Sequence, residues 1–171
     1  MTVMSPRPTY PANMPVDALR VAELVLVTTL RLFVAVEWQR PGPAPDWRGG
    51  LQAAGIAPAG ADSFLALCRF LAVAARRPLD LRCPHCATLG RDEILLLRLI
   101  SLLQHGRHAD AQAILQDWLP PTGARMAMLP AQGLATAFRK AGLVVLLRHP
   151  EAATQPHGMP RFPDRGLALV Q

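Results

Sequence analysis

Apolar side chains recur along most of the chain at the spacing of an α-helix. Between residues 15 and 38 the polar positions lie three to five residues apart in an otherwise apolar stretch. The valines there would also suit a strand, but the period favours a helix. Between residues 63 and 77 the apolar residues have the spacing of a buried helical face: Phe64, Leu67, Cys68, Leu71 and Ala74. The pattern predicts helices at residues 15–38, 47–54, 63–77, 91–104, 108–119 and 123–141, and the helix that ends at residue 119 starts at either His108 or Asp110.

Residues with known effects on helix ends set the boundaries of these segments. Asp62 or Ser63 is expected to cap the third segment at its start, and Pro78 to stop it. Gly106 is expected to end the fourth segment. Pro130 lies inside the last segment and is expected to split it in two or to kink it. Residues 143–147 either finish that helix or form one short strand.

The fourth and fifth segments are joined by a short turn, so residues 91–119 are predicted to form an αα-hairpin. This stretch resembles a single tetratricopeptide-type hairpin, but no second copy follows at a period near 34 residues. We therefore predict an all-α single domain, a small bundle of five to six helices, over residues 15–148. Residues 1–14 are expected to form an irregular arm and residues 149–171 a loose, proline-rich tail. The proline-rich stretch 41–45 is the clearest linker.

The composition supports one compact domain. The chain has 171 residues, of which 51% are hydrophobic, and this is enough for a sizeable core. Its net charge of +6 is spread thinly, and the nearest approach to a basic cluster is formed by Arg76, Arg77 and Arg82. Nucleic-acid binding needs basic residues concentrated on one face. We do not expect a nucleic-acid partner, and binding through these three arginines stays as the last alternative.

The most apolar run of the chain does not qualify as a membrane span. Residues 21–36 contain Glu23 and Arg31, and the run is shorter than the roughly 20 apolar residues that a span requires. The first 15 residues contain prolines and no apolar leader segment. We therefore expect a cytoplasmic protein with no membrane-inserted segment.

The most specific chemical signal in the chain is a C-x2-C motif, which consists of Cys83, Pro84, His85 and Cys86. Two cysteines at this spacing can share a metal, form a disulfide or stay reduced. Thiolate and imidazole are ligands that zinc favours. The metal hypothesis makes Cys83, Cys86 and His85 the candidate zinc ligands. Any further ligand would come from Cys68, Asp92 or Glu93, or from a second subunit across a dimer axis.

Two histidines farther along, His105 and His108, complete the spacing of a Cys2His2 zinc site on paper. If residues 91–104 form one straight helix, that helix is roughly 20 Å long. The cysteines precede it and the histidines follow it, whereas zinc ligands lie about 2 Å from one metal. We therefore expect the two histidines to cap the helix end and not to bind a metal together with the cysteines.

The C-x2-C tetrapeptide resembles the active-site motif of the periplasmic disulfide oxidoreductases of the thioredoxin superfamily. The resemblance covers four residues. It implies that Cys83 is the attacking thiol, Cys86 the resolving thiol and His85 the residue that tunes them. In that family the first cysteine lies at a helix N-terminus, and strands flank the motif on both sides. Neither a strand beside the motif nor the later strand pair that this fold needs can be found after Cys86 in this chain.

No phosphate-binding glycine loop, serine nucleophile elbow or zinc-protease motif occurs in the sequence. Asp80, Asp92 and Glu93 are expected to be solvated or to cap a helix. We therefore predict a non-enzymatic interaction or regulatory protein, whose wide apolar helix faces bind a protein partner or a second copy in a homodimer. The alternative is a metal- or thiol-responsive sensor, in which ligation at Cys83 and Cys86 changes the packing of the bundle.

Overall fold

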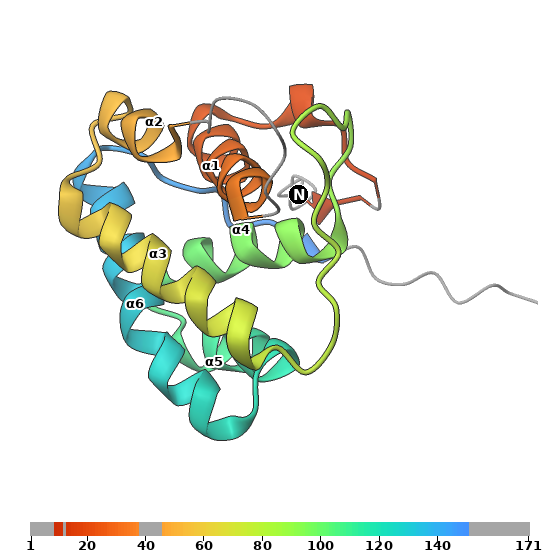
Figure 1. Cartoon of the computed structure of the whole chain (residues 1–171), viewed down its shortest axis with the longest axis vertical. Coiled ribbons are helices and arrows are strands. Elements are labelled where there is room, and N and C mark those ends of the chain that lie inside the picture. The colour runs from red at the N-terminus through yellow and green to blue at the C-terminus, as the bar shows by residue number, and fades with distance from the viewer. Residues whose placement is uncertain (1–8, 12, 38–45, 151–171) are drawn as a thin grey trace, which may run out of the picture.

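The computed structural model describes residues 9–11, 13–37 and 46–150, and within them it confirms the all-α fold (Figure 1). The first element is β1 (Thr9–Tyr10), which pairs in parallel with β2 (His149–Pro150), and a 3-10 turn at Val16–Ala18 follows β1 in the chain. The six helices are α1 (Val21–Glu37), α2 (Trp47–Ala53), α3 (Pro58–Ala74), α4 (Arg91–Gln104), α5 (His108–Trp118) and α6 (Pro121–Lys140).

Helix α4 lies at the centre of the bundle and contacts α1, α5 and α6. The most extensive helix contact is between α3 and α6, which pack against each other. Large side chains from all of these layers are fully buried in one continuous cluster: Leu26, Phe64, Leu97, Trp118 and Phe138 are examples. The predicted αα-hairpin is confirmed as α4 and α5, with Gly106 between them at a φ of 73°. A positive φ favours glycine, which is why the turn falls there.

The predicted limits of α3 were wrong at both ends. The helix starts at Pro58 and not at Asp62 or Ser63, because proline suits the first helical position, where no N–H bond is needed. The Ser63 hydroxyl instead donates to the carbonyl of Ala59, 2.8 Å away inside the helix. At the other end α3 stops at Ala74, and the N–H of Arg76 donates to the carbonyl of Trp118 at 2.8 Å. A tertiary contact, and not Pro78, ends the helix.

Of the two outcomes expected for Pro130, a split or a kink, the split does not occur, since α6 is continuous from Pro121 to Lys140. Proline inside a helix costs about 3 kcal/mol. Helix α6 buries Ala127, Ala131 and Leu134 against α3, α4 and α5. Because tertiary packing of an apolar face supplies most helix stability in proteins, it outweighs the cost of the proline.

Both ends of the described chain contribute to the fold. Tyr10 and Met14 are buried, so part of the segment predicted as an irregular arm belongs to the core. Residues 143–147 form neither the helix end nor the strand that was predicted. They run extended beside α4, where the Gln104 amide donates to the carbonyl of Leu143 and accepts from the N–H of Val145, both at 2.9 Å. The linker prediction at 41–45, and the tail prediction beyond residue 150, lie outside the described residues.

None of the helices that the structure describes combines the length and the hydropathy that a membrane crossing needs.

Candidate functional site

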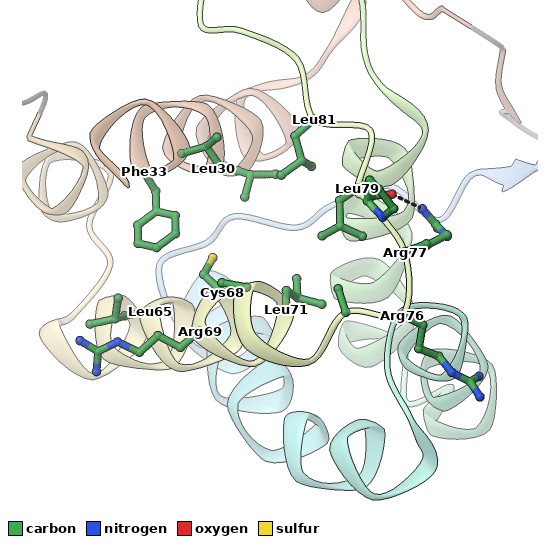
Figure 2. Close-up of a pocket in the computed structure, with 14 residues that line it drawn as sticks. Leu30, Phe33, Leu65, Cys68, Arg69, Leu71, Arg76, Arg77, Leu79 and Leu81 are labelled. Carbon is green, nitrogen blue, oxygen red and sulfur yellow. Dashed lines mark hydrogen bonds between the residues drawn. The ribbon is translucent and has the colours of Figure 1, made fainter. Parts of the chain in front are cut away.

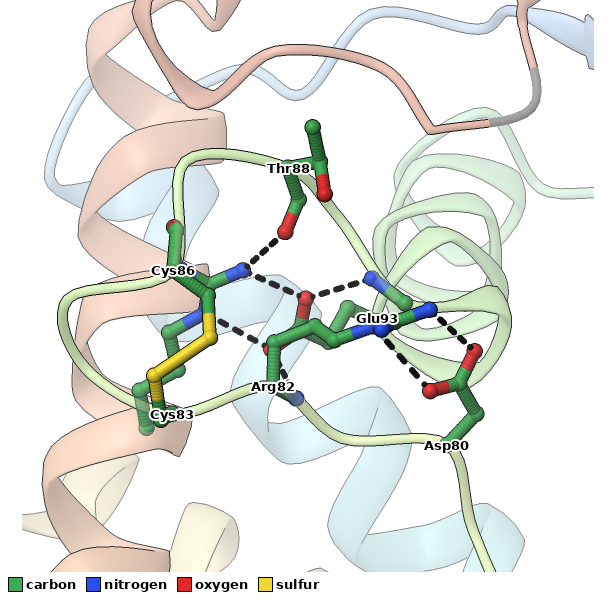
Figure 3. Close-up of a disulfide and its surroundings, with 8 residues drawn as sticks. Asp80, Arg82, Cys83, Cys86, Thr88 and Glu93 are labelled. Atoms are coloured by element: carbon green, nitrogen blue, oxygen red, sulfur yellow. Dashed lines mark hydrogen bonds and ion pairs between the residues drawn. A yellow bond between two sulfur atoms is a disulfide. The ribbon is translucent and has the colours of Figure 1, made fainter.

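The C-x2-C motif lies in the loop that joins α3 to α4, residues 75–90, which we call the disulfide loop. Cys83 and Cys86 form a disulfide, with their Cα atoms 5.3 Å apart (Figure 3). The N–H of Cys86 also donates to the carbonyl of Cys83 at 3.0 Å, which closes the same turn through the backbone. Both cysteines are half-buried and His85 is exposed. The disulfide is therefore within reach of a reagent in solution while its backbone is held in place.

Arg31 of α1 holds this turn from the inside of the protein. Its guanidinium donates to the carbonyl of Cys86 at 2.7 Å and to that of Thr88 at 2.8 Å. The same group donates two bonds of 2.8 Å to the Glu93 carboxylate (Figure 3). The side chains of Arg31 and Glu93 are 4% and 0% exposed. The two bonds between Arg31 and Glu93 are thus shielded from water, which strengthens charge-assisted hydrogen bonds, while the bonds to the two carbonyls are partly buried.

Glu93 connects the disulfide loop to the start of α4. Besides Arg31, its carboxylate accepts from the N–H of Gly90 at 2.8 Å and from the N–H of Arg82 at 3.1 Å. The bond from Gly90 satisfies one of the N–H groups that a helix start leaves without a partner. The capping role predicted for Glu93 is confirmed. Of the two alternatives given for Glu93, solvated or capping, the structure shows the second, and the paired arginine allows the capping carboxylate to be buried.

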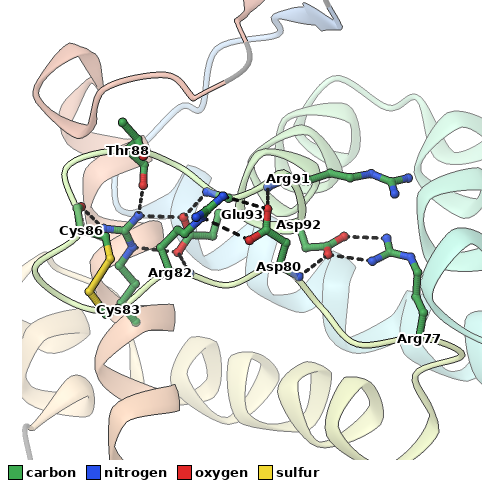
Figure 4. Close-up of polar contacts among 11 residues, drawn as sticks. Arg77, Asp80, Arg82, Cys83, Cys86, Thr88, Arg91, Asp92 and Glu93 are labelled. Carbon is green, nitrogen blue, oxygen red and sulfur yellow. Dashed lines mark hydrogen bonds and ion pairs between the residues drawn. A yellow bond between two sulfur atoms is a disulfide. The ribbon is translucent and has the colours of Figure 1, made fainter.

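Asp92 is a second buried carboxylate at the same helix start (Figure 4). It accepts two hydrogen bonds from the Arg77 guanidinium, at 2.8 and 2.7 Å, and one from the Trp118 indole at 2.8 Å. The N–H of Asp80 donates a further bond at 2.6 Å. Burial acts to raise the pKa of Asp92, but the bonds from these three residues outweigh it, and the pKa lies below its ordinary value. The expected solvation of Asp92 was therefore wrong.

Asp80 caps α4 from within the disulfide loop, as predicted. Its carboxylate accepts from the N–H of Arg91 at 2.8 Å, the first residue of the helix. It also forms an ion pair with Arg82, 3.2 Å away. Asp80, Asp92 and Glu93 together bind the disulfide loop to the N-terminal turn of α4 (Figure 4). Carboxylates are stabilised there by the helix dipole as well as by their partners.

The basic cluster considered for nucleic-acid binding is largely neutralised. Arg77 pairs with Asp92 and with Asp117, each at 2.7 Å, and these hydrogen bonds raise the pKa of Arg77 above its ordinary value. Arg82 pairs with Asp80. Because a phosphate backbone is bound by unpaired Lys and Arg side chains, two of the three arginines are poorly suited to that role.

The segment that follows the disulfide is bound to the N-terminal part of the chain. The N–H of Val16 donates to the carbonyl of Ala87 at 2.8 Å, and the N–H of Leu89 donates to that of Met14 at 2.9 Å. A β-bridge pairs Pro15 with Thr88 between these bonds. The disulfide loop is therefore in contact with the N-terminal segment, α1 and α4 at once.

A third buried carboxylate, Glu23 in α1, joins the two ends of the described chain. It accepts two bonds of 2.9 Å from Arg148 and one of 2.7 Å from the Tyr10 hydroxyl. Burial and the hydrogen bond to Glu23 raise the pKa of Tyr10 well above its ordinary value. Sequence reasoning missed this group and the Arg31–Glu93 pair. The available signal was the presence of Glu23 and Arg31 in an apolar helix, because charges in such a position are buried only when paired.

The predicted separation of the cysteine and histidine pairs is confirmed. Helix α4 is unbroken from Arg91 to Gln104, and His105 lies at its far end with its Nδ1 2.8 Å from the carbonyl of Ser101. Across the described ranges, no three His, Cys, Asp or Glu side chains lie close enough together to hold a metal. Cys68 is buried in α3, in a separate element from the motif. Zinc binding by Cys83, Cys86 and His85 stays a prediction.

The arrangement implied by the oxidoreductase resemblance is absent from the motif. Helix α4 begins at Arg91, five residues after Cys86, so neither cysteine lies at a helix N-terminus. The helix dipole that stabilises the attacking thiolate in such enzymes therefore does not act on Cys83. The loop can still undergo thiol–disulfide exchange, since that chemistry needs only an accessible disulfide and a thiolate.

Comparisons of the chain with protein-family models, with curated proteins and with solved structures find no match.

Proposed function

We propose that the protein is a non-enzymatic regulatory module whose conformation responds to the thiol–disulfide state of Cys83 and Cys86. The observation that carries this proposal is the double role of Arg31. It donates to the carbonyl of Cys86 inside the disulfide turn and, with the same guanidinium, to Glu93 at the start of α4. A change in the backbone of the turn therefore acts directly on a buried contact between α1 and α4.

The chemical step is a two-electron exchange with an external dithiol reductant. One reductant thiolate attacks a sulfur of the Cys83–Cys86 bond, and its second thiol then resolves the mixed disulfide. The protein gains two electrons and two protons as two thiols, and the reductant becomes a disulfide. The half-buried sulfurs beside exposed His85 give such a reagent access. Loss of the S–S bond leaves two hydrogen bonds to hold the turn, the backbone bond from Cys86 to Cys83 and the bond from Arg31 to the Cys86 carbonyl.

The position of the disulfide favours regulation over a purely stabilising role. Its cysteines are three residues apart. A disulfide that closes so short a loop restricts the unfolded chain little and stabilises the folded protein by only about 2 kcal/mol. A disulfide that closes a loop of about 100 residues stabilises it by nearly 5 kcal/mol. Reduction is therefore expected to leave the bundle folded and to change mainly the disulfide loop and the elements it contacts.

The test is amide hydrogen exchange, read by mass spectrometry, on oxidised protein and on protein reduced with a dithiol. Residues 75–90 and the first turn of α4 are expected to exchange faster in the reduced protein, while α3 and α6 stay unchanged as an internal reference. The Cys83→Ser/Cys86→Ser variant should match the reduced protein under both conditions. Alkylation and peptide mapping confirm which cysteines have reacted.

Two results would contradict the proposal. Equal exchange in the oxidised and reduced proteins would show that the disulfide is not coupled to α1 and α4. Stoichiometric zinc in the reduced protein, measured by elemental analysis and lost in the double serine variant, would replace the thiol switch with the metal site considered from the sequence.

A further inference from the structure

A cleft of about 860 Å³ lies between α1 and α3, and the first part of the disulfide loop forms its end wall (Figure 2). Leu30 and Phe33 project into it from α1, Cys68 and Leu71 face them from α3, and Leu79 and Leu81 come from the loop. Most of the remaining lining is apolar as well. The volume is within the range of ligand pockets in proteins, and an open apolar cleft of this size suits an apolar occupant.

The charged side chains that line the cleft are all positive. Among the described residues that line it are Arg69, Arg76 and Arg77, and none of these lining residues is Asp or Glu. Arg77 is neutralised by Asp92 and Asp117. Arg69 and Arg76 are exposed, and neither forms an ion pair with any residue that the structure describes. The cleft thus presents an apolar floor with two exposed arginines at its rim: Arg69 on α3, and Arg76 at the start of the disulfide loop, where it also donates to the carbonyl of Gln116 at 3.4 Å. This positive charge is complementary to an acidic, apolar occupant.

The segments of this chain outside the described residues do not have that chemistry. Residues 1–8 and 38–45 each contain one arginine and no acidic residue, and residues 151–171 contain two acidic residues and two arginines. Their net charges are therefore +1, +1 and 0, with histidine counted as neutral. Charge complementarity points to an occupant from another molecule.

Several backbone groups of the cleft walls are already bonded within the protein, so an occupant meets mainly side chains. In the loop wall the N–H of Arg76 donates to Trp118, that of Asp80 to Asp92, and that of Leu81 to Leu79. The opposite wall is the helix α3, whose backbone groups bond within the helix. An extended peptide that adds to a strand edge would find no edge here. An amphipathic helix, which binds through side chains alone, meets the requirement.

We propose that this cleft binds an acidic amphipathic helix of a partner protein. Its apolar face occupies the space between Leu30, Phe33 and Leu71, and its acidic side chains pair with Arg69 and Arg76. This inference goes beyond the thiol-dependent function and does not rest on it. The two share the disulfide loop, because Leu79 and Leu81 line the cleft in the same loop that carries Cys83 and Cys86.

The probe is a labelled model peptide with leucines at i, i+3, i+4 and i+7 and glutamates on both sides of that face, and its binding is followed by fluorescence anisotropy. The comparison peptide has lysine in place of every glutamate. We expect the acidic peptide to bind about tenfold more tightly, with a difference that shrinks as salt is added. Equal binding of the two peptides, or tighter binding of the lysine peptide, would overturn the proposal.

Two variants, with one matched control, test whether the peptide binds in the cleft. Arg69→Glu/Arg76→Glu is expected to weaken acidic-peptide binding at least about tenfold, because attraction becomes repulsion at the rim. Arg125→Glu/Arg139→Glu is the matched control, since both arginines are exposed on α6 outside the cleft and the net charge changes equally. Ala72→Trp places a large side chain at an exposed lining position and should block binding while circular dichroism stays unchanged. Equal binding by all variants would overturn the proposal.

Other occupants are separate outcomes of the same experiments. If light scattering detects a dimer that Ala72→Trp disrupts and that does not bind the peptide, the cleft is assigned to a second copy of the chain. Saturable binding of a fatty acid without peptide binding would assign it to a lipid.

Each measurement is made on oxidised protein and on Cys83→Ser/Cys86→Ser. Equal peptide binding by both would support the docking site and contradict a thiol switch that reaches the cleft.

Discussion

Arg31 and Glu93 lie 62 positions apart in the chain and form a two-bonded ion pair that is almost completely removed from water. This pair joins α1 to α4 and, through the carbonyls of Cys86 and Thr88, fixes the disulfide loop between them. Arg31 makes four hydrogen bonds from one guanidinium, which is a use of its planar fork of donors that lysine could not reproduce. The pair is therefore the structural centre of the candidate site.

Removal of either partner of this pair is expected to destabilise the fold strongly. Arg31→Met leaves the Glu93 carboxylate buried without its cation, and Glu93→Gln leaves the Arg31 guanidinium buried without its anion. Each should lower the free energy of unfolding by about 3–5 kcal/mol, measured by urea denaturation. Arg31→Met/Glu93→Leu should lose less than the sum of the single changes, because neither buried charge is then left alone.

The exposed pair between Arg48 and Asp62, 3.1 Å apart, supplies the matched control. Arg48→Met removes an arginine from an ion pair of similar type on the surface, and its effect should stay within about 1 kcal/mol. If Arg31→Met and Arg48→Met had the same small effect, the buried pair would not be the contact that holds the loop.

The helical fold was predictable because it follows from a local property. Phe64, Leu67 and Leu71 line one face of α3 as their spacing indicated, and all three are buried. The errors arose where a contact between distant parts of the chain decides the outcome. Helix α3 ends early because Arg76 bonds to Trp118, and α6 continues through Pro130 because it is packed on three neighbouring helices. Local propensity contains no information on either contact.

The candidate site was predictable in its position but not in its connections. The C-x2-C motif marked the loop, and its separation from His105 followed from helix length alone. The role of Arg31 could not be derived, because its partners are the carbonyls of Cys86 and Thr88 and the carboxylate of Glu93 in another element. Hydrogen bonds to backbone carbonyls depend on the path of the loop, and no side-chain pattern in the sequence records it.

The lowered pKa of Asp92 predicts a specific loss of stability in acid. Above about pH 5, well over the ordinary carboxyl pKa, Asp92 is ionised in both the folded and the unfolded chain, and its pairing with Arg77 contributes fully. As the pH falls further the unfolded chain takes up the proton first, so the contribution decreases and is lost once the folded carboxyl is also protonated. The difference in unfolding free energy between wild type and Asp92→Asn should therefore be constant from about pH 5 to 7 and shrink below about pH 4.

Urea denaturation at a series of pH values measures this difference directly. Asp62→Asn is the control, because Asp62 is exposed and its ion pair is on the surface. A difference between wild type and Asp92→Asn that stays constant down to about pH 2 would contradict the role of Asp92 as a buried, ionised partner of Arg77.

The raised pKa of Tyr10 predicts the opposite dependence in alkali. Below about pH 10 the hydroxyl is protonated in both states, and its bond to Glu23 contributes to stability. Above that pH the unfolded tyrosine ionises while the folded one keeps its proton, so the protein should lose stability. Tyr10 is the single tyrosine of the chain, so tyrosinate absorbance reports it alone. Tyr10→Phe should cost about 1–3 kcal/mol at neutral pH and remove this part of the alkaline loss. Tyrosinate absorbance that rises at the ordinary pKa in folded protein would contradict burial of the hydroxyl.

Substitutions at two glycines that lie in helices, Gly50 and Gly60, measure the effect of helix propensity and the effect of packing between α3 and α6 separately. A Cβ added at Gly60 would lie 2.6 Å from the Cβ of Ala137 in α6 and 2.6 Å from Cγ2 of Ile56, whereas one added at Gly50 in α2 would meet nothing within 4 Å. Alanine is intrinsically better than glycine in a helix by about 0.5–1 kcal/mol. Gly50→Ala should therefore stabilise the protein by up to about that amount. Gly60→Ala should destabilise it by about 1–3 kcal/mol, because the close approach of α3 to α6 cannot accommodate a methyl group without displacement. Urea denaturation of both variants compares the two effects, and a Gly60→Ala protein as stable as Gly50→Ala would mean that the two helices are not packed as closely as the structure shows.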